Sequence, residues 1–299
     1  MVPAMTRAEA DVSIEASKND LARELFVRTA DENYTTARWC AINGLNTDFL
    51  WLALHALEKY LKAVLLVNGR STRGFGHDVV RLHAEVRAFA GPLLPAKLEK
   101  PVKLDIYHWR ERTAEEFMGH LLSNGNADNR YAIYGYVTSS QDLHMLDMMV
   151  FAVRRLVCSL DDRVFPGNDP GAPTFTHRDV LTRQPDYYDR MSMPLDSLIS
   201  AKEDSDARGA ALNLNLPFAP SDFAHEPIRS GSSARNPVIM RRILDPLDSD
   251  DPRWAVEGVE LARWFLENVQ VPKGKPSDPG VAEQIKAAIE AARTKHGLS

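Results

Sequence analysis

An arginine and a histidine lie close together in the glycine-containing segment NGRSTRGFGHDVVRL, which covers residues 68–82. Arg70 and His77 are separated by six residues, so a loop that folds back would bring a guanidinium and an imidazole to one phosphate group. Such a pair can cleave RNA without a metal, because the imidazole takes the proton of a ribose 2′-hydroxyl and the guanidinium stabilises charge developing on the phosphate. We therefore take Arg70 and His77 as candidate catalytic residues.

The glycines of this segment do not make it a nucleotide-binding phosphate loop. Gly69 and Gly74 have the spacing of a Walker loop, but Phe75 and Gly76 stand where that loop needs lysine and then serine or threonine. The segment also follows an expected helix, whereas a Walker loop follows a strand. The turn between two helices is the better interpretation of the glycines.

The nearby histidines do not match a known metal-binding motif. His77 and His83 are six residues apart, so they do not lie one turn apart on a helix. No HExxH motif occurs, and the triplet that begins at His83 lacks the Pro-Cys-x-x-Cys sequence of zinc deaminases. We expect no metal and no other cofactor.

Further cations accompany the segment and predict contact with the phosphates of RNA or of a nucleotide. They are Lys59, Lys62, Arg73 and Arg81. Because the whole chain has a net charge of −5, any such contact must be a local basic patch, in which like charges within a Debye length of about 8–10 Å attract phosphate. One alternative stays open: His77 caps the next helix and the arginines are solvated loop residues.

The bulk properties of the chain exclude several protein classes. The chain has 299 residues, of which 44% are hydrophobic, and this is enough to bury a core without disulfides. Its two cysteines, Cys40 and Cys158, have no metal or redox spacing, which indicates a reducing compartment. The N-terminus lacks the apolar core of a signal peptide, and charges interrupt the most apolar segment, residues 49–67. We expect a cytoplasmic protein without membrane contact.

Helical periodicity dominates the first half of the chain. Apolar residues recur every three or four positions over residues 19–44, 47–67 and 77–90. A fourth helix is expected over residues 102–122. A long helix is expected over residues 139–160, where leucines and valines form a heptad-like seam. The pattern predicts a helical bundle.

The composition changes after about residue 162. Residues 163–251 contain scattered prolines, serines and charges, so we expect an irregular, extended or partly disordered segment with short strands at residues 211–218 and 237–244. Two helices are expected to close the chain. The predicted domains are a helical bundle over residues 18–162, the irregular segment, and a helical pair over residues 252–299.

The second expected helix and the histidine after it resemble the HEPN domain. The helix carries an Ala-x-Glu-Lys-x-Leu-Lys core at residues 56–62, and a loop leads to a His-x-x-x-x-Leu helix start at His77 and Leu82. The resemblance covers roughly residues 20–160. It implies a mainly α fold, with a bundle of about five helices that is usually a homodimer or paired with a partner protein. Many members bind nucleotides or RNA, and a large subset are ribonucleases.

One landmark of the nuclease members is altered in this chain. Those members carry Arg-Asn-x-x-x-His near the last long helix, and the matching segment here is DNRYAIYGY, residues 128–136. Asn129 stands at the arginine position and Tyr134 at the histidine position, while Arg130 is one place off. A tyrosine with an ordinary pKa of about 10 is a poor base at neutral pH. We therefore expect Arg130 to contact RNA or a nucleotide and not to act in catalysis.

Two functions remain in competition. The first is an RNA- or nucleotide-binding protein, in its active form a metal-independent endoribonuclease of a toxin–antitoxin or antiphage system, with His77 as base and Arg70 stabilising the phosphate. The second is a non-catalytic dimerising or adaptor module that binds a partner protein through its C-terminal region. The altered DNRYAIYGY segment favours the second.

Overall fold

The computed structural model describes most of the chain and divides it into two compact units. Unit 1 contains residues 1–125 and 139–231, and unit 2 contains residues 126–138 and 232–299. The description covers residues 7–106, 108–127, 129, 135–164, 174–228, 231–269 and 280–298, with side chains from residue 14 onward.

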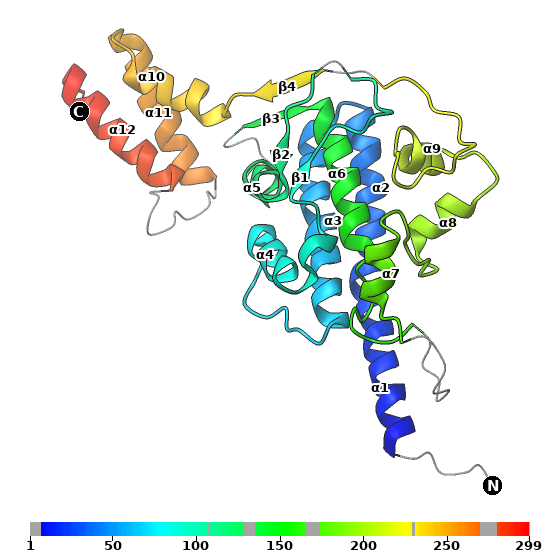
Figure 1. Cartoon of the computed structure of the whole chain (residues 1–299). Helices are drawn as coiled ribbons and strands as arrows, with labels where there is room; N and C mark the ends of the chain where they lie inside the picture. The colour runs from blue at the N-terminus through cyan, green and yellow to red at the C-terminus, as the bar shows by residue number, and fades with distance from the viewer. Residues whose placement is uncertain are drawn as a thin grey trace. The chain divides into compact units, whose positions relative to one another are not determined.

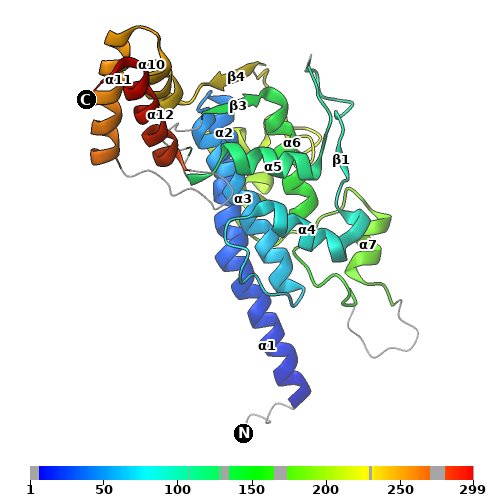
Figure 2. The ribbon, with the colours of Figure 1, turned by 90° about the vertical axis from the view of Figure 1, so that its left-hand side faces the viewer.

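Unit 1 begins with a long, nearly continuous helical run. It consists of α1 (Arg7–Ala22), the π-helical turn η1 (Arg23–Val27) and α2 (Arg28–Ile42). Figure 2 shows α1 projecting beyond the other helices of this unit. The run ends where Gly44 adopts a φ of +75°, a left-handed conformation that favours glycine.

The central helix of unit 1 is α3 (Asn46–Val67), and it has the position that its apolar sequence predicts. It packs against α2, α4, α5 and α6 (Figure 1). Five of its leucines are almost completely buried, and each of these contributes about 1.5–3 kcal/mol of transfer free energy as an upper estimate. Those leucines are Leu50, Leu54, Leu57, Leu61 and Leu65.

The helix after the glycine-containing loop is α4 (Val79–Ala90), and its N-cap is Asp78. The Asp78 carboxylate accepts a hydrogen bond from the backbone N–H of Arg81 at 3.0 Å. The expected start at residue 77 and the alternative in which His77 caps the helix are therefore wrong. The carboxylate reaches the free N–H groups of the first turn, whereas the His77 ring turns towards α3.

The helix expected over residues 102–122 begins only at α5 (Ala114–Asn124). Before it, β1 (Lys97–Leu98) pairs with β2 (Arg112–Thr113) in an antiparallel ladder, and Thr113 then forms a capping box with Glu116. The expected helix was too long because the capping box sets the start by local hydrogen bonds, and periodicity alone does not show where they begin.

The helix α6 (Ser140–Arg154) is buried on most of its surface. It ends six residues before the expected end at residue 160, although Leu156 and Leu160 remain in the core. The next described helices along the chain are α7 (His177–Arg183), α8 (Pro194–Ser200) and α9 (Asp206–Leu212).

Buried ion pairs attach α8 and α9 to the bundle. Arg154 of α6 bonds Asp31 of α2 at 3.0 Å and Asp196 of α8 at 3.0 Å, and all three side chains are at most 5% exposed. Arg38 of α2 pairs with Asp147 of α6 and donates to backbone carbonyls at and just after α9. The strand expected at residues 211–218 is therefore wrong: the chain turns here so that its carbonyls reach Arg38.

Unit 2 has its own small core. It contains β3 (Tyr136–Ser139, ending at the boundary with unit 1), β4 (Ser232–Arg235), η4 (Met240–Leu244), α10 (Asp245–Asp248), α11 (Pro252–Asn268) and α12 (Val281–His296). The two strands pair with each other. The strand expected at residues 237–244 is wrong, because Ile239, Ile243 and Leu247 share one helical face and pack against α11 and α12.

The fold class agrees with the sequence. The described residues are mainly helical, their sheets have two strands each, and the loop-rich C-terminal region ends in α11 and α12. The division at residues 162 and 251 stays a prediction. Within the described ranges, no helix has both the length and the apolarity that a membrane crossing requires.

Replacing Arg154 tests whether the buried ion pairs hold the C-terminal part of unit 1. We expect Arg154→Met to lower the free energy of unfolding by about 3–5 kcal/mol, because Asp31 and Asp196 would be left buried without their cation. Urea unfolding followed by circular dichroism measures this loss. Arg28→Ala is the control, because it removes an exposed ion pair with Glu24 and should leave unfolding nearly unchanged. Equal effects of the two substitutions would contradict the assignment.

Candidate functional site

Four polar side chains meet where α3 faces the loop of residues 68–78. Three of them, His55, Glu58 and Lys62, come from α3 at spacings of three and four residues, which places them on one face of the helix. The fourth, His77, comes from the end of the loop. We call these four residues the Glu58 cluster.

The Glu58 carboxylate is the acceptor at the centre of this cluster. Its side chain is only 5% exposed. Nδ1 of His55 lies 3.2 Å from Oε2, Nδ1 of His77 lies 3.0 Å from Oε2, and Nζ of Lys62 lies 2.6 Å from Oε1. Each of the two carboxylate oxygens thus accepts from at least one neighbouring side chain.

These donors keep Glu58 ionised. Burial by itself raises the pKa of the carboxyl, but the hydrogen bonds from His55, Lys62 and His77 outweigh it and lower the pKa to about 2. An ionised carboxylate only accepts, so Nδ1 of His55 and of His77 must carry a hydrogen in this arrangement.

His77 is held by one ring nitrogen and open at the other. Its side chain is 77% exposed although Nδ1 contacts the buried carboxylate. In the neutral ring, a proton on Nδ1 leaves the lone pair on Nε2, which is the form that accepts a proton. A carboxylate behind an exposed imidazole also stabilises the imidazolium that such a transfer produces. The arrangement can therefore support general-base chemistry.

The loop itself is fixed by the same cluster. Nζ of Lys62 also donates to the backbone carbonyl of Gly76 at 2.8 Å. Gly74 and Gly76 have φ values of +85° and +56°, so another residue at either position would strain the loop. Lys62 thus positions the loop, and its contact with phosphate stays a prediction.

Arg70 faces a different neighbour from His77. Its guanidinium pairs with Glu85 of α4 at 2.8 Å and lies 4.4 Å from the ring centroid of Phe89. Among the described contacts, no hydrogen bond joins Arg70 to His77. Their meeting at one phosphate stays a prediction.

The other predicted phosphate contacts have unequal surroundings. Lys59 turns towards α2, where its ammonium donates to Oδ1 of Asn33, and burial lowers its pKa. Arg81 is exposed, with its guanidinium 5.2 Å from the Phe75 ring. Arg73 is exposed in the loop. Arg130, like Tyr134, lies outside the described residues.

Sequence reasoning did not single out His55 or Glu58 as site residues. The available signal was a His-x-x-Glu spacing on one helical face, at His55 and Glu58. The third member, His77, comes from the loop 19 residues after Glu58, so the spacing alone does not reveal the cluster.

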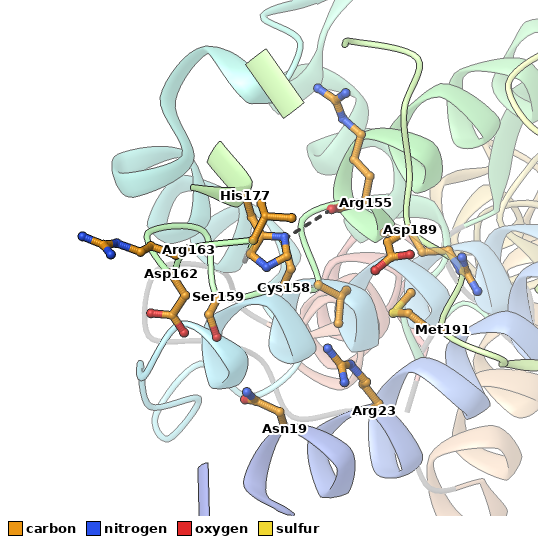
Figure 3. A pocket seen from close by; sticks show the side chains of 13 residues that line it. Asn19, Arg23, Arg155, Cys158, Ser159, Asp162, Arg163, His177, Asp189 and Met191 are labelled. Atoms are coloured by element: carbon orange, nitrogen blue, oxygen red, sulfur yellow. Dashed lines mark hydrogen bonds between the residues drawn. The ribbon is translucent and has the colours of Figure 1, made fainter. Parts of the chain in front are cut away.

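A separate pocket of about 330 Å³ lies between α1, η1 and the loop after α6. Figure 3 shows Arg23 on one side of it, whereas the guanidinium groups of Arg155 and Arg163 point away from its centre. Asp162 and Asp189 also line it. Its thiol, Cys158, is no nucleophile, because burial raises the pKa to about 12. The pocket therefore favours neither catalysis nor strong anion binding.

Comparison with known proteins finds a family match for the part of the chain that contains the Glu58 cluster. Residues 23–142 match the family model of the HEPN domain. This range includes α2 to α5 and therefore every member of the Glu58 cluster. No curated protein sequence matches the chain significantly, and no solved structure does.

The stability that Glu58 contributes should depend on pH. The folded state lowers its pKa from 4.5 to about 2, so the contribution is complete above pH 4.5 and is lost as the pH falls towards 2. We expect Glu58→Gln to reduce the free energy of unfolding at neutral pH by at most about 2–3 kcal/mol. Urea unfolding of both proteins should show this difference shrinking at low pH. A difference that does not change with pH would contradict the assigned carboxylate.

Proposed function

We propose that this chain, which contains a HEPN domain at residues 23–142, binds RNA or a nucleotide at the loop of residues 68–78 and the start of α4. The HEPN family is linked in general to RNA binding or ribonuclease activity. The finer proposal is a metal-independent endoribonuclease that works as a dimer in a toxin–antitoxin or antiphage system.

The observation that carries the proposal is the exposed His77 ring on the buried Glu58 carboxylate. A histidine that serves only as a structural hydrogen-bond donor does not need an open second nitrogen. Here 77% of the side chain faces solvent, and the carboxylate behind it is ionised. Those two properties are what a base for a 2′-hydroxyl requires.

The positive charges of the loop support phosphate contact. Arg73 and Arg81 are exposed on either side of His77 in the sequence. Arg70 adds a guanidinium that stacks on Phe89, and a stacked guanidinium offers its planar face and its N–H groups at once. Glu85 neutralises part of this charge, so RNA would compete with Glu85 for Arg70.

The proposed cleavage step uses these residues as follows. Nε2 of His77 takes the proton of the 2′-hydroxyl, and the 2′-oxygen forms a bond to phosphorus. The bond from phosphorus to the 5′-oxygen breaks, and the imidazolium returns its proton to that oxygen. The products are a 2′,3′-cyclic phosphate and a 5′-hydroxyl, while Glu58 stabilises the imidazolium and Arg70 the phosphate oxygens.

A specific observation also supports the alternative, a dimerising or adaptor module. On α11 of unit 2, Trp254 and Trp264 are 60% and 56% exposed, and Leu261 lies on the same helical face. Large exposed apolar side chains of this kind often contact a partner protein. A chain that neither binds nor cleaves RNA would leave this function as the better proposal.

Removing the base should abolish cleavage. We expect the intact protein to cleave RNA in the presence of EDTA and to leave 2′,3′-cyclic phosphate ends, whereas His77→Ala should lose about 10²–10⁴-fold in rate. Arg70→Ala should also be slower. His108→Ala, which removes an exposed histidine from outside the Glu58 cluster, is the control. Cleavage that is absent, or equal in all variants, rules out the proposed base.

Arg73 should contribute to affinity for RNA and not to the integrity of the fold. We expect Arg73→Ala to weaken binding of a single-stranded RNA and to reduce the slope of log affinity against log salt by about 0.7 per lost phosphate contact. Fluorescence anisotropy in the presence of EDTA measures both quantities. Arg163→Ala makes the same charge change at an exposed site near the separate pocket. An equal loss in both variants would show a general charge effect and no loop-specific contact.

A further inference from the structure

Three side chains able to bind a metal ion converge in the Glu58 cluster. Ligand atoms of His55, Glu58 and His77 all lie within 4.8 Å of one another. Two imidazoles and one carboxylate are a common ligand set for transition metals, since imidazole suits zinc, nickel and iron better than it suits magnesium or calcium. We propose that these three residues bind one divalent transition-metal ion of the zinc class.

The distances within the cluster fit this proposal. Two ligand atoms bound to tetrahedral zinc at about 2.0–2.1 Å lie roughly 3.3 Å apart. Oε2 of Glu58 lies 3.2 Å from Nδ1 of His55 and 3.0 Å from Nδ1 of His77. The carboxylate oxygen is thus already at ligand distance from both imidazoles. Only the two rings need to approach each other, and the exposed His77 sits next to a glycine.

Lys62 does not occupy the oxygen that the metal needs. Its ammonium bonds Oε1 of Glu58, whereas Nδ1 of His55 lies 3.2 Å from Oε2, and Nδ1 of His77 lies 3.0 Å from Oε2 and 3.1 Å from Oε1. One carboxylate can therefore bind a metal through Oε2 and keep its ion pair through Oε1. The positive charge of Lys62 lowers the affinity for a cation, so we expect a weaker site than a structural zinc site, in which all four ligands come from the protein.

His55 is well placed to be a fixed ligand. Its ring meets the indole of Trp51 edge to face, with centroids 4.0 Å apart, and this contact restricts its rotation. Nε2 of His55 is buried, and the described residues provide no hydrogen-bond partner for it. A metal on Nδ1 would move the ring proton to this buried nitrogen and leave its N–H unpaired, which weakens the site further. The neutral ring is the form that binds metals.

The exposure of His77 leaves room for further ligands. Three protein ligands with open positions are typical of sites where the metal also holds water or a small anion. A metal on Nδ1 of His77 would place the ring proton on Nε2, so the metal-bound ring is a donor and not a base. Zinc would therefore suppress the RNA cleavage proposed above, although the metal site itself does not depend on that proposal.

Cobalt binding tests the site directly. The full-length protein, freed of metal by a chelator, is titrated with Co²⁺ and its visible absorption recorded, and Zn²⁺ affinity is then measured by competition with a chromophoric chelator. We expect one ion per chain. His55→Ala and His77→Ala should each weaken Zn²⁺ binding at least tenfold, roughly the lower range known for lost support of a metal site. His108→Ala should bind as the unaltered protein does.

The variants keep the test decisive. His77 is exposed, so its replacement should leave the circular dichroism spectrum unchanged even where His55→Ala or Glu58→Gln loses stability. Failure of the unaltered protein to bind one ion, or equal affinity in the His77→Ala and His108→Ala proteins, would overturn the proposal. RNA binding and cleavage are measured in EDTA, so the failure of either proposal is seen separately from that of the other.

Discussion

The buried guanidinium of Arg154 is the constraint on which the rest of unit 1 depends. A charge of this size cannot be taken out of water without partners, since the effective cost is several kcal/mol per ion. Arg154 therefore has two carboxylates, Asp31 from α2 and Asp196 from α8. Because one cation binds elements far apart in the sequence, α2, α6 and α8 must adopt one arrangement or leave charges unpaired.

A second buried pair extends the same rule. Arg38 and Asp147 join α2 to α6, the hydroxyl of Tyr34 donates to Asp147, and Arg38 holds backbone carbonyls around α9. Desolvation raises the pKa of Tyr34 well above its ordinary value, so this hydroxyl remains a donor. The bundle is thus held by directional polar contacts inside an apolar core, to which the buried α3 leucines contribute.

In the Glu58 cluster, near the surface, a buried charge is likewise stabilised by polar partners. One buried carboxylate gathers two imidazoles and an ammonium, and the position of the loop follows from these bonds. The same arrangement that holds the loop also directs one nitrogen of His77 to solvent. The contact between Glu58 and His77 therefore both holds the loop and orients the imidazole. It links the Glu58 motif of α3 to the histidine of the loop. No member of the cluster comes from the altered segment at residues 128–136.

Local sequence determined the elements whose signal is strong and continuous. The apolar face of α3, the end of the first helical run at Gly44 and the two final helices could be predicted, because each depends on side chains within a few turns. Arg70 and His77 could be found as chemically capable residues, but their neighbours Glu85 and Glu58 could not, since residue type does not show which side chain a flexible loop will meet.

Only the tertiary structure decided the path of residues 194–215 and the geometry of the site. These residues lack helical periodicity, yet α8 and α9 form. Asp196 pairs with the buried Arg154, 42 residues earlier in the chain, and the carbonyl of Asn213 accepts from Arg38, 175 residues earlier. Such pairings depend on the free energy of desolvating a charge in the assembled core, and the sequence of a short segment does not contain this information. For the same reason, the sequence alone determined that an imidazole follows α3, and folding decided that its Nδ1 meets a carboxylate and its Nε2 meets solvent.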